Sequence, residues 1–394
     1  MTEEAAVGGS IGPLVAADEY FNHQIVETFA TVSQTDYAWT EKVCLMAAAK
    51  DGSLQIGFGF GKYINRNVMD AYAGVARGTE QWTVRTSRKL SSDVDSVDVG
   101  PIRYEILEPL NLIRVVLEPN ELQPVAFDLV LQGTVPCVVE EREDRRTVTG
   151  YRRTADQIRY HQTGVVKSGW VEVDGERTEV GPEDWIMTRD HSWGVRPGVG
   201  DDVLDIAPEP SERNMPSILA VWNPLYFEHP DGSNYAFHQY LLRYEAPGYL
   251  HKVAQGGFEY ADGPRDLITD IEPKITFDPS NKRFLGGTFH LTMADGHQRV
   301  LEAEPLSDTG FHLGAGHYLR PNGERGGSWK GEFFIDGTYY PDTSLPEVAE
   351  KINQFRDCII RVHDVETGAT GWGNIQTWVA GSWPEMGLSD DAAS

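Results

Sequence analysis

Short turns built from Asp-Gly and Asn-Gly recur along almost the whole chain, and they constrain its fold more than any other feature. Both dipeptides suit the positive-φ positions of two-residue hairpin turns, so each one predicts a reversal between antiparallel strands. They stand at Asp51-Gly52, Asp174-Gly175, Asp231-Gly232, Asp295-Gly296, Asn322-Gly323 and Asp336-Gly337. A chain punctuated in this way is predicted to consist mainly of antiparallel strands.

The segments between these turns alternate as strands do. Before Asp295, the apolar residues Phe289, Leu291 and Met293 alternate with polar ones, which is the period of a half-buried strand. In residues 53–63, apolar side chains occupy every second position, and three glycines occupy the positions between them. Glycines that share one face predict close approach of another backbone, or a curved barrel wall.

Helical spacing is scarce. Residues 345–361 place apolar side chains three and four positions apart, as an amphipathic helix does, and residues 16–31 do so more weakly. Everything else indicates strands and turns. We therefore predict an all-β fold, in which antiparallel strands close into barrels or stack as sheets.

The domain organisation is inferred from one acidic, proline-rich segment near the middle of the chain, residues 197–216. It has no sustained periodicity, which is typical of a linker or a long surface loop. We predict an N-terminal extension at 1–35, a first β domain at 36–200, a linker at 201–216 and a second β domain at 217–394.

Charge and composition exclude several partners. Lys and Arg number 34 against 60 Asp and Glu, so the formal net charge is 34 − 60 = −26. So acidic a chain repels nucleic acid and anionic membranes. The N-terminus lacks the features of a signal peptide, and no apolar run approaches the ~18 residues of a membrane span. Cys44, Cys137 and Cys358 are widely spaced, which predicts buried free thiols in a reducing compartment, the cytoplasm.

The densest group of polar and aromatic residues lies at 185–196. Asp190 and His191 are a candidate proton donor and its partner, Trp193 offers a π face, and the flanking arginines can bind anions or pair with carboxylates. A purely structural interpretation is also open, in which Arg189 and Asp190 form a buried ion pair at a domain junction and Trp193 fills a core.

Several motifs together resemble a known superfamily. Residues 159–164, the predicted hairpin at 170–180 and the Asp-His-Ser-Trp-Gly motif at 190–194 look like those of tandem lipocalin-like proteins, a group that includes carotenoid 1,2-hydratase (hydroxyneurosporene synthase) and AttH-like proteins. Residues 58–63 and 103–109, followed by Phe127-Asp128-Leu129, resemble the N-terminal half of such proteins. The recognisable motifs cover roughly residues 40–200.

This resemblance implies two calycin-like β-barrels with an apolar ligand pocket in or between them. It also implies roles by position, with Asp190 as the proton donor to an alkene, His191 as its orienting partner and Trp193 as a wall that stabilises a carbocation. Such chemistry needs a neutral carboxyl group, which desolvation in an apolar pocket favours. The superfamily also contains pericyclic cyclases, so the fold alone does not select an activity.

Other residues are candidates for binding a hydrophobic substrate. They lie in aromatic-rich strands of the second half and beside the first motif, where barrel-core packing is the alternative interpretation. The predicted substrate-binding residues are Tyr160, His161, Trp222, Tyr226, Tyr235, Phe237, His238, Trp372, Asn374 and Trp378.

No cofactor is predicted. The spacing of His312, His317, His363 and Asp364 is weak as a metal-binding pattern, and we expect no metal. The single Gly-Xaa-Ser-Xaa-Gly match, residues 8–12, follows no predicted strand, so we expect no nucleophile elbow, and the sequence has no phosphate-binding loop or dinucleotide fingerprint.

Three hypotheses follow. The first is an enzyme that hydrates, dehydrates or isomerises a C=C bond of a terpenoid-like or polyene-like substrate by acid catalysis, with Asp190 as the acid. The second is a non-catalytic carrier of apolar ligands, in which the run from Arg189 to Arg196 clamps two domains together. The third is a cyclase that works by preorganising its substrate. An Asp190→Asn substitution separates them, since it should abolish hydration, spare carrier affinity and affect a cyclase only partly.

Overall fold

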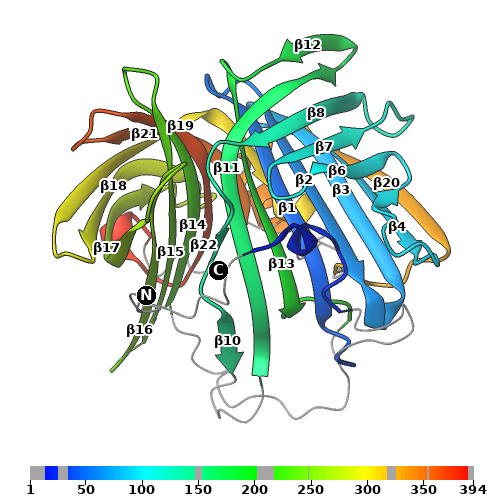
Figure 1. Cartoon of the computed structure of the whole chain (residues 1–394), viewed down its shortest axis with the longest axis horizontal. Helices are drawn as coiled ribbons and strands as arrows, with labels where there is room; N and C mark the ends of the chain where they lie inside the picture. Colours follow the sequence, from blue (N-terminus) through cyan, green and yellow to red (C-terminus); the bar gives the residue numbers. More distant parts are fainter. Residues whose placement is uncertain are drawn as a thin grey trace.

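Two curled β-structures stand side by side (Figure 1). The structure, a computed structural model, describes residues 14–24, 34–146, 153–201, 217–246, 248–316, 325–352 and 355–388. In these residues nearly all regular structure is antiparallel strand, so the predicted all-β class is confirmed.

The first body is a 14-stranded sheet that curls into a half-barrel. Its path runs β20-β4-β3-β2-β1-β13-β11-β8-β7-β6-β5, and β9, β10 and β12 pair with β11. The strands from the first half of the chain are β1 (Trp39–Ala49), β2 (Gln55–Tyr63), β3 (Val68–Arg77), β4 (Glu80–Lys89), β5 (Asp98–Val99), β6 (Ile102–Glu108), β7 (Leu112–Leu117), β8 (Val125–Gly133), β9 (Val138–Val139), β10 (Glu143–Arg146), β11 (Arg153–Val173), β12 (Glu176–Val180) and β13 (Trp185–Val195).

The second body is a closed barrel with an apolar interior. Its strands are β14 (Ser217–Glu228), β15 (Asn234–Ala246), β16 (Tyr249–Glu259), β17 (Asp266–Phe277), β18 (Phe284–Met293), β19 (Gln298–His312), β21 (Arg356–Asp364) and β22 (Thr370–Ala380). The helical elements are short: α1 (Pro346–Ile352) and the 3-10 turns η1 (Ala16–Glu19), η2 (Ile64–Arg66), η4 (Leu313–Ala315) and η5 (Pro384–Met386).

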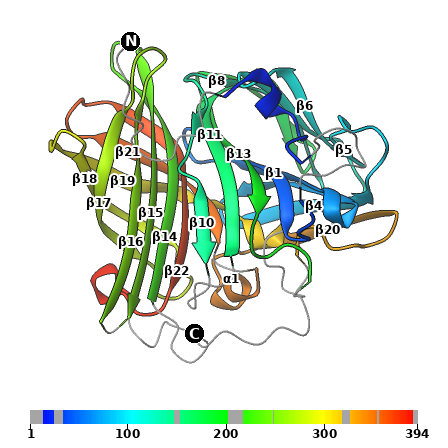
Figure 2. The same cartoon turned by 60° about the horizontal axis from the view of Figure 1, so that its bottom comes forward.

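One strand of the second half belongs to the first sheet. β20 (Phe333–Tyr340) pairs antiparallel with β4, with Tyr339 opposite Trp82 and Asp336 opposite Arg85. Figure 2 shows β20 in orange beside the blue β4, away from the barrel. The two halves of the chain are therefore joined by backbone pairing as well as by side-chain packing.

The first sheet packs against the barrel where β11 and β13 contact β14, β13 contacts β22, and β2, β3 and β4 contact β19. A small apolar cluster fills part of this interface: Met46, Ala48, Ile186, Tyr226 and Ile359, with Val165, Leu306 and Trp372 at its border. Beyond this cluster the interface becomes polar, and the candidate site lies there.

The glycine face of β2 is an example of close approach, as its pattern predicted. A Cβ atom at Gly57 would lie 2.4 Å from the ring of Phe311, which comes from β19 of the second half. On the other face of the same strand, Phe58 and Phe60 are buried in the core of the first sheet. The alternation therefore gives β2 two different faces: its phenylalanines pack in the core of the first sheet, and its glycines lie against the second half of the chain.

The helical prediction at 345–361 is only partly right. The helix α1 ends at Ile352, and β21 begins at Arg356. In β21, Cys358 and Ile360 enter the barrel core, whereas Ile359 enters the interface cluster. A strand buried on both faces carries consecutive apolar residues, which helical spacing also matches. Of residues 16–31, only 16–19 form a 3-10 turn, and residues 25–31 lie outside the described residues.

The turn predicted at Asp336-Gly337 is wrong, because both residues lie inside β20. The Asp336 carboxylate accepts two hydrogen bonds from Arg85 on the neighbouring β4, each 2.9 Å long, so a side-chain contact places this dipeptide in a strand. The turns at Asp51, Asp174, Asp231 and Asp295 do connect paired strands. Asn322-Gly323 lies outside the described residues.

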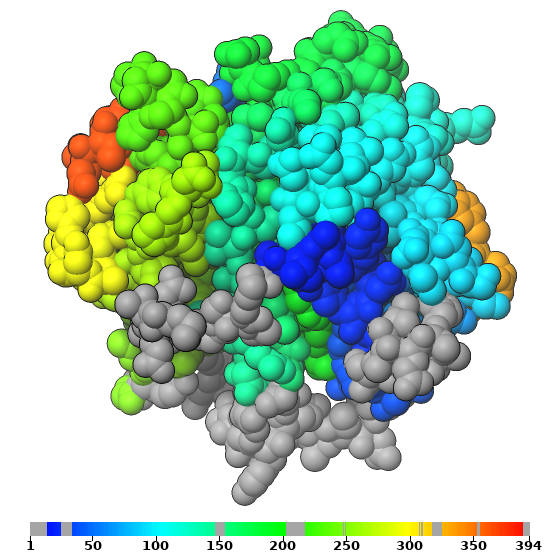
Figure 3. All heavy atoms as spheres, viewed as in Figure 1, coloured from blue at the N-terminus to red at the C-terminus, as the bar shows by residue number. Residues whose placement is uncertain are grey.

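The predicted domain boundaries stay a prediction. Most of the proposed linker, residues 202–216, and most of the proposed N-terminal extension lie outside the described residues. Residues 14–24 of that extension are described, and Figure 3 shows them in dark blue against the cyan strands of the first sheet. There Phe21 is buried among the core residues of this sheet.

Candidate functional site

Neighbouring residues of β13 point to opposite faces of the first sheet, and this divides the predicted catalytic group. Asp190 faces the barrel and lines a cavity between the two bodies. His191 faces the concave side, where it lies 3.1 Å from the hydroxyl of Tyr160. Trp193 stacks on His23, with 3.6 Å between ring centroids. The structure therefore does not bring His191 or Trp193 to Asp190.

The cavity has a volume of about 270 Å³ and lies between the first sheet and the barrel. Its wall on the sheet side carries charged residues, and its wall on the barrel side carries aromatic ones. The lining residues used below are Lys42, Glu143, Arg145, Arg159, Asp190 and Arg196 from the first half, and Trp222, Tyr240, Phe355 and Trp378 from the second. An apolar ligand with one polar end matches such a lining.

Asp190 has the electrostatic setting of an acid. Burial raises the pKa of its carboxyl group, and the positive charges of Arg159, Arg196 and Lys42 only partly offset that effect. Arg159 Nε lies 3.1 Å from Asp190 Oδ2. The contact with Arg159 holds the carboxyl group in place, while desolvation favours its protonated form.

Lys42 is a second shifted group in the same lining. It stands two residues before Cys44 on the face of β1 that meets the barrel. Burial lowers the pKa of Lys42 to about 8, with a smaller contribution from Arg196 in the same direction. A carboxyl group and an amine whose pKa values both move toward neutrality line one cavity, which is typical of catalytic sites.

Beside the cavity lies a buried cluster of two histidines and two glutamates from both halves. His161 Nδ1 is 3.1 Å from Glu140 Oε1, and His161 Nε2 is 2.8 Å from Glu259 Oε1. The ring of His238 stacks on that of His161 at 3.8 Å. Burial opposes the charge on His161, but the two glutamates outweigh it and raise its pKa to about 9. Burial, reinforced by nearby His161, lowers the pKa of His238.

The predicted substrate-binding residues separate into five places. Trp222 and Trp378 line the cavity, and the indole of Trp222 donates a 3.0 Å hydrogen bond to Glu140 Oε1. His161 and His238 belong to the buried cluster. Tyr226 and Trp372 belong to the apolar cluster of the interface. Asn374 is also at the interface, where its Oδ1 accepts a 2.6 Å hydrogen bond from the Thr188 hydroxyl. Tyr235 and Phe237 are in the barrel core, and Tyr160 is on the concave side of the first sheet.

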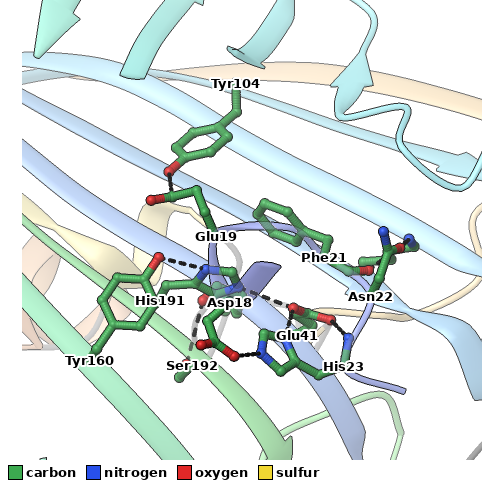
Figure 4. A network of polar contacts seen from close by, with 12 residues as sticks. Asp18, Glu19, Phe21, Asn22, His23, Glu41, Tyr104, Tyr160, His191 and Ser192 are labelled. Carbon is green, nitrogen blue, oxygen red and sulfur yellow. Dashed lines mark hydrogen bonds and ion pairs between the residues drawn. The ribbon is translucent and has the colours of Figure 1, made fainter. Parts of the chain in front are cut away.

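The concave side of the first sheet holds a separate polar network, drawn in Figure 4. Glu41 Oε1 lies 2.6 Å from His23 Nδ1 and 3.2 Å from His191 Nε2. The remaining ring nitrogens contact Asp18 and Tyr160, respectively. Every ring nitrogen in this group has a polar partner, so the N-terminal segment is tied to the sheet through satisfied contacts.

The structural interpretation of the motif paired Arg189 with Asp190. The structure instead pairs Arg189 with Glu19. The ion pair with Glu19 is bidentate: Arg189 Nη1 lies 2.6 Å from Glu19 Oε1, and Arg189 Nη2 lies 2.9 Å from Glu19 Oε2. Tyr104 and the backbone N–H of Leu110 also donate to the Glu19 carboxylate. Both charged side chains are almost fully buried, so this pair anchors η1 inside the half-barrel.

The acid dependence of folding should report on this pair. Burial alone would raise the pKa of Glu19, but the charge and hydrogen bonds of Arg189 outweigh burial and lower it from 4.5 to about 2. Because the folded pKa is the lower one, the contribution of Glu19 to stability is complete above pH 4.5 and is lost as the pH falls toward 2. Urea unfolding of the native chain and the Glu19→Gln variant, from about pH 6 to about pH 2, measures this. The difference between them should shrink on acidification, and a constant difference would contradict the assignment.

Sequence reasoning missed several residues of the site. Lys42, Glu140 and Arg159 lie near the predicted acid only because β1, β9 and β11 pair beside β13 or its neighbours. Neither Lys42 nor Arg159 is an isolated charge in an apolar strand, because Lys42 follows Thr40-Glu41 and Arg159 is close to His161-Gln162. Of the weak metal pattern, His312 contacts Arg356, Asp364 pairs with Arg299, and His317 lies outside the described residues.

Comparison with protein families assigns the chain to a family. Residues 14–389 match the family described as Family of unknown function (DUF8625). The chain belongs to that family. A search of curated proteins found no match for this DUF8625 member.

Solved structures with a related fold were also found. A putative AttH from Nitrosomonas europaea has 13% identity and a TM-score of 0.49, over 86% of this chain and 92% of its own. CghA has 13% identity and a TM-score of 0.48, over 98% and 95%. Kievitone hydratase from Nectria haematococca has 10% identity and a TM-score of 0.41, over 91% and 95%. Each of these likenesses has an identity of 10–13% and a TM-score below 0.5, and none of them assigns an activity to this chain.

The described part of this DUF8625 chain contains no helix that is long and apolar enough to cross a membrane.

Proposed function

We propose that the chain is an enzyme that protonates a C=C bond of a hydrophobic, terpenoid-like or polyene-like substrate and thereby hydrates, dehydrates or isomerises it without a cofactor. The observation that carries this proposal is the position of Asp190. Its carboxyl group, with a raised pKa, lines a cavity whose opposite wall is aromatic.

The chemistry of an alkene explains why these features belong together. An isolated C=C bond is a very weak base, so the acid has to be a neutral carboxyl group, which burial favours. Proton transfer from Asp190 to one alkene carbon leaves a carbocation on the other and a carboxylate at Asp190. Ring faces hold a positive charge, and the rings available in this cavity are those of Trp222, Tyr240 and Trp378. In this proposal they replace Trp193 as the stabilising wall.

The reaction is completed by water or by loss of a proton. In hydration, a water oxygen bonds to the carbocation, and the proton that this water loses returns to the Asp190 carboxylate or passes to the neutral amine of Lys42. Lys42 supports this step because its pKa of about 8 leaves part of it unprotonated near neutral pH. In isomerisation, the carbocation instead loses a proton from a neighbouring carbon to the Asp190 carboxylate, which regenerates the acid. Dehydration is the reverse of hydration.

The test uses the full chain and a panel of apolar alkenes and tertiary alcohols in water enriched in oxygen-18. We expect mass spectrometry to detect label in the alcohol product, since hydration adds a solvent oxygen. Isomerisation instead gives a product of unchanged mass with a different retention time. Tight binding of ligands that all come back unchanged would overturn the proposal and favour a carrier of apolar ligands.

A further inference from the structure

The buried histidine cluster brings together ligand atoms from three separate segments. Glu140 directly follows β9, His161 lies on β11, and His238 lies on β15 of the barrel. One ligand atom from each of Glu140, His161 and His238 lies within 4.8 Å of the other two. Two histidines and a carboxylate are a common ligand set for zinc and similar divalent ions.

The spacing of these atoms is that of ligands around one ion. Glu140 Oε1 lies 3.1 Å from His161 Nδ1 and 3.3 Å from His238 Nε2. Atoms that each sit about 2.0–2.2 Å from a zinc ion, at tetrahedral angles, are separated by roughly 3.3–3.5 Å. The rings of His161 and His238 stack at 3.8 Å, so one ring has to turn before both nitrogens can face the same ion.

One of the three atoms lacks a hydrogen bond. Among the described residues, His238 Nε2 is buried and makes no hydrogen bond, although Glu140 Oε1 is near it. A buried polar atom left in this way is costly unless something satisfies it. The similar group His23, Glu41 and His191 on the concave side differs, because each of its ring nitrogens already has a polar partner.

The surroundings hold these ligand atoms in position. His161 Nε2, the nitrogen away from the other two ligand atoms, lies 2.8 Å from Glu259 Oε1, and Arg265 donates to that same oxygen at 3.0 Å. Metal-binding histidines usually donate their second N–H to a carboxylate in this way. Trp222 Nε1 donates to Glu140 Oε1, which fixes the carboxylate.

We propose that Glu140, His161 and His238 bind one divalent transition-metal ion, with Zn²⁺ as the probe, and that this ion links the first sheet to the barrel. His161 then binds through Nδ1 and keeps its proton on Nε2, so the proton now shared with Glu140 leaves to solvent. The site shares Trp222 with the cavity wall, but its test counts bound zinc and does not depend on the proposed reaction.

The experiment counts bound metal in the full chain. The purified protein is treated with a chelator, dialysed against Zn²⁺ and then against metal-free buffer, and its zinc is measured by mass spectrometry. We expect one Zn²⁺ per chain, a loss of that zinc in Glu140→Gln and His238→Phe, and about 10–100-fold weaker binding in Glu259→Gln. Phenylalanine retains the ring that stacks on His161.

The matched control is His23→Phe, which changes the other histidine group and retains a ring against Trp193. It should bind zinc as the native chain does. X-ray absorption of the native zinc-loaded chain keeps the proposal testable if a variant fails to fold, and it should show two imidazoles and a carboxylate. No zinc in the native chain, zinc retained by His238→Phe, zinc lost in His23→Phe, or an all-oxygen shell would each overturn the site.

Discussion

Replacing Asp190 with asparagine should lower turnover by about 10²–10⁴-fold while leaving substrate affinity close to that of the native chain. Asparagine has nearly the same shape, and its amide oxygen can still contact Arg159, but it has no acidic proton to give. Because proton transfer to the alkene comes first, every later step depends on it. The measurement is the rate of product formation by mass spectrometry, beside the dissociation constant of the same substrate.

Asp357 provides a matched control for this substitution. It is another buried aspartate, and burial raises its pKa to about 7, but it does not line the cavity. Its Oδ1 accepts hydrogen bonds from Asn374 and Gln376, both 2.9 Å long, and an asparagine oxygen can accept the same two. Asp357→Asn should therefore turn over substrate at about the native rate.

Other outcomes have clear meanings. If Asp190→Asn loses only a small part of the activity, the acid role is wrong, and a cyclase that preorganises its substrate explains the result better. If neither the native chain nor the variant changes a ligand that both bind equally well, the carrier hypothesis is favoured. If Asp357→Asn fails as badly as Asp190→Asn, the loss comes from the interface and does not identify an acid.

Replacing Arg189 with methionine should destabilise the folded chain by about 3–5 kcal/mol. The substitution leaves the Glu19 carboxylate buried without its counter-charge, and among the described residues Tyr104 and the N–H of Leu110 are the donors that remain. Removal of one member of a buried ion pair lowers the free energy of unfolding by more than the intact pair contributes to it. The reason is that the remaining charge stays buried away from water without its counter-charge. Urea unfolding at neutral pH measures the change in the free energy of unfolding.

The control is Arg177→Met, which removes an arginine whose side chain is 48% exposed and which pairs with Glu179 within a hairpin. Exposed pairs of this kind contribute about 0–1 kcal/mol, so this variant should unfold almost as the native chain does. Equal, small effects of both substitutions would mean that Glu19 and Arg189 are not held together in solution. A double variant, Glu19→Gln with Arg189→Met, should recover part of the stability lost by Arg189→Met alone.

Much of the architecture was readable from local patterns, because hairpin turns and strand alternation depend on residues close in sequence. Asp174-Gly175 connects two paired strands, and the Gly57 face does meet another part of the chain. The failures have the same origin. Asp336-Gly337 looks like a turn but is held in a strand by Arg85, a contact across about 250 residues. The apolar run at 358–360 looks helical because both faces of β21 are buried.

The site shows what a contiguous motif conceals. Residues 189–193 are neighbours in sequence, but a strand sends alternate side chains to opposite faces, so Asp190 meets the barrel while Arg189 and His191 meet the concave side. The partners of each come from elsewhere: Arg159 for Asp190, Glu19 for Arg189 and Glu41 for His191. None of these pairings has a signature in sequence spacing.

The sequence by itself determined that this chain is antiparallel and all-β, that it is strongly acidic, and that its polar and aromatic residues concentrate around Asp190. These properties follow from the alternation of side chains along a strand, from the residues that form tight turns, and from the sum of the charges. Each of these depends on neighbouring residues or on a simple sum over the chain. Only the tertiary structure decided that β20 joins the first sheet, that the cavity lies between two bodies, and that Glu140, His161 and His238 converge. Such contacts depend on how two curled sheets pack, and packing selects partners by shape and burial rather than by distance along the chain.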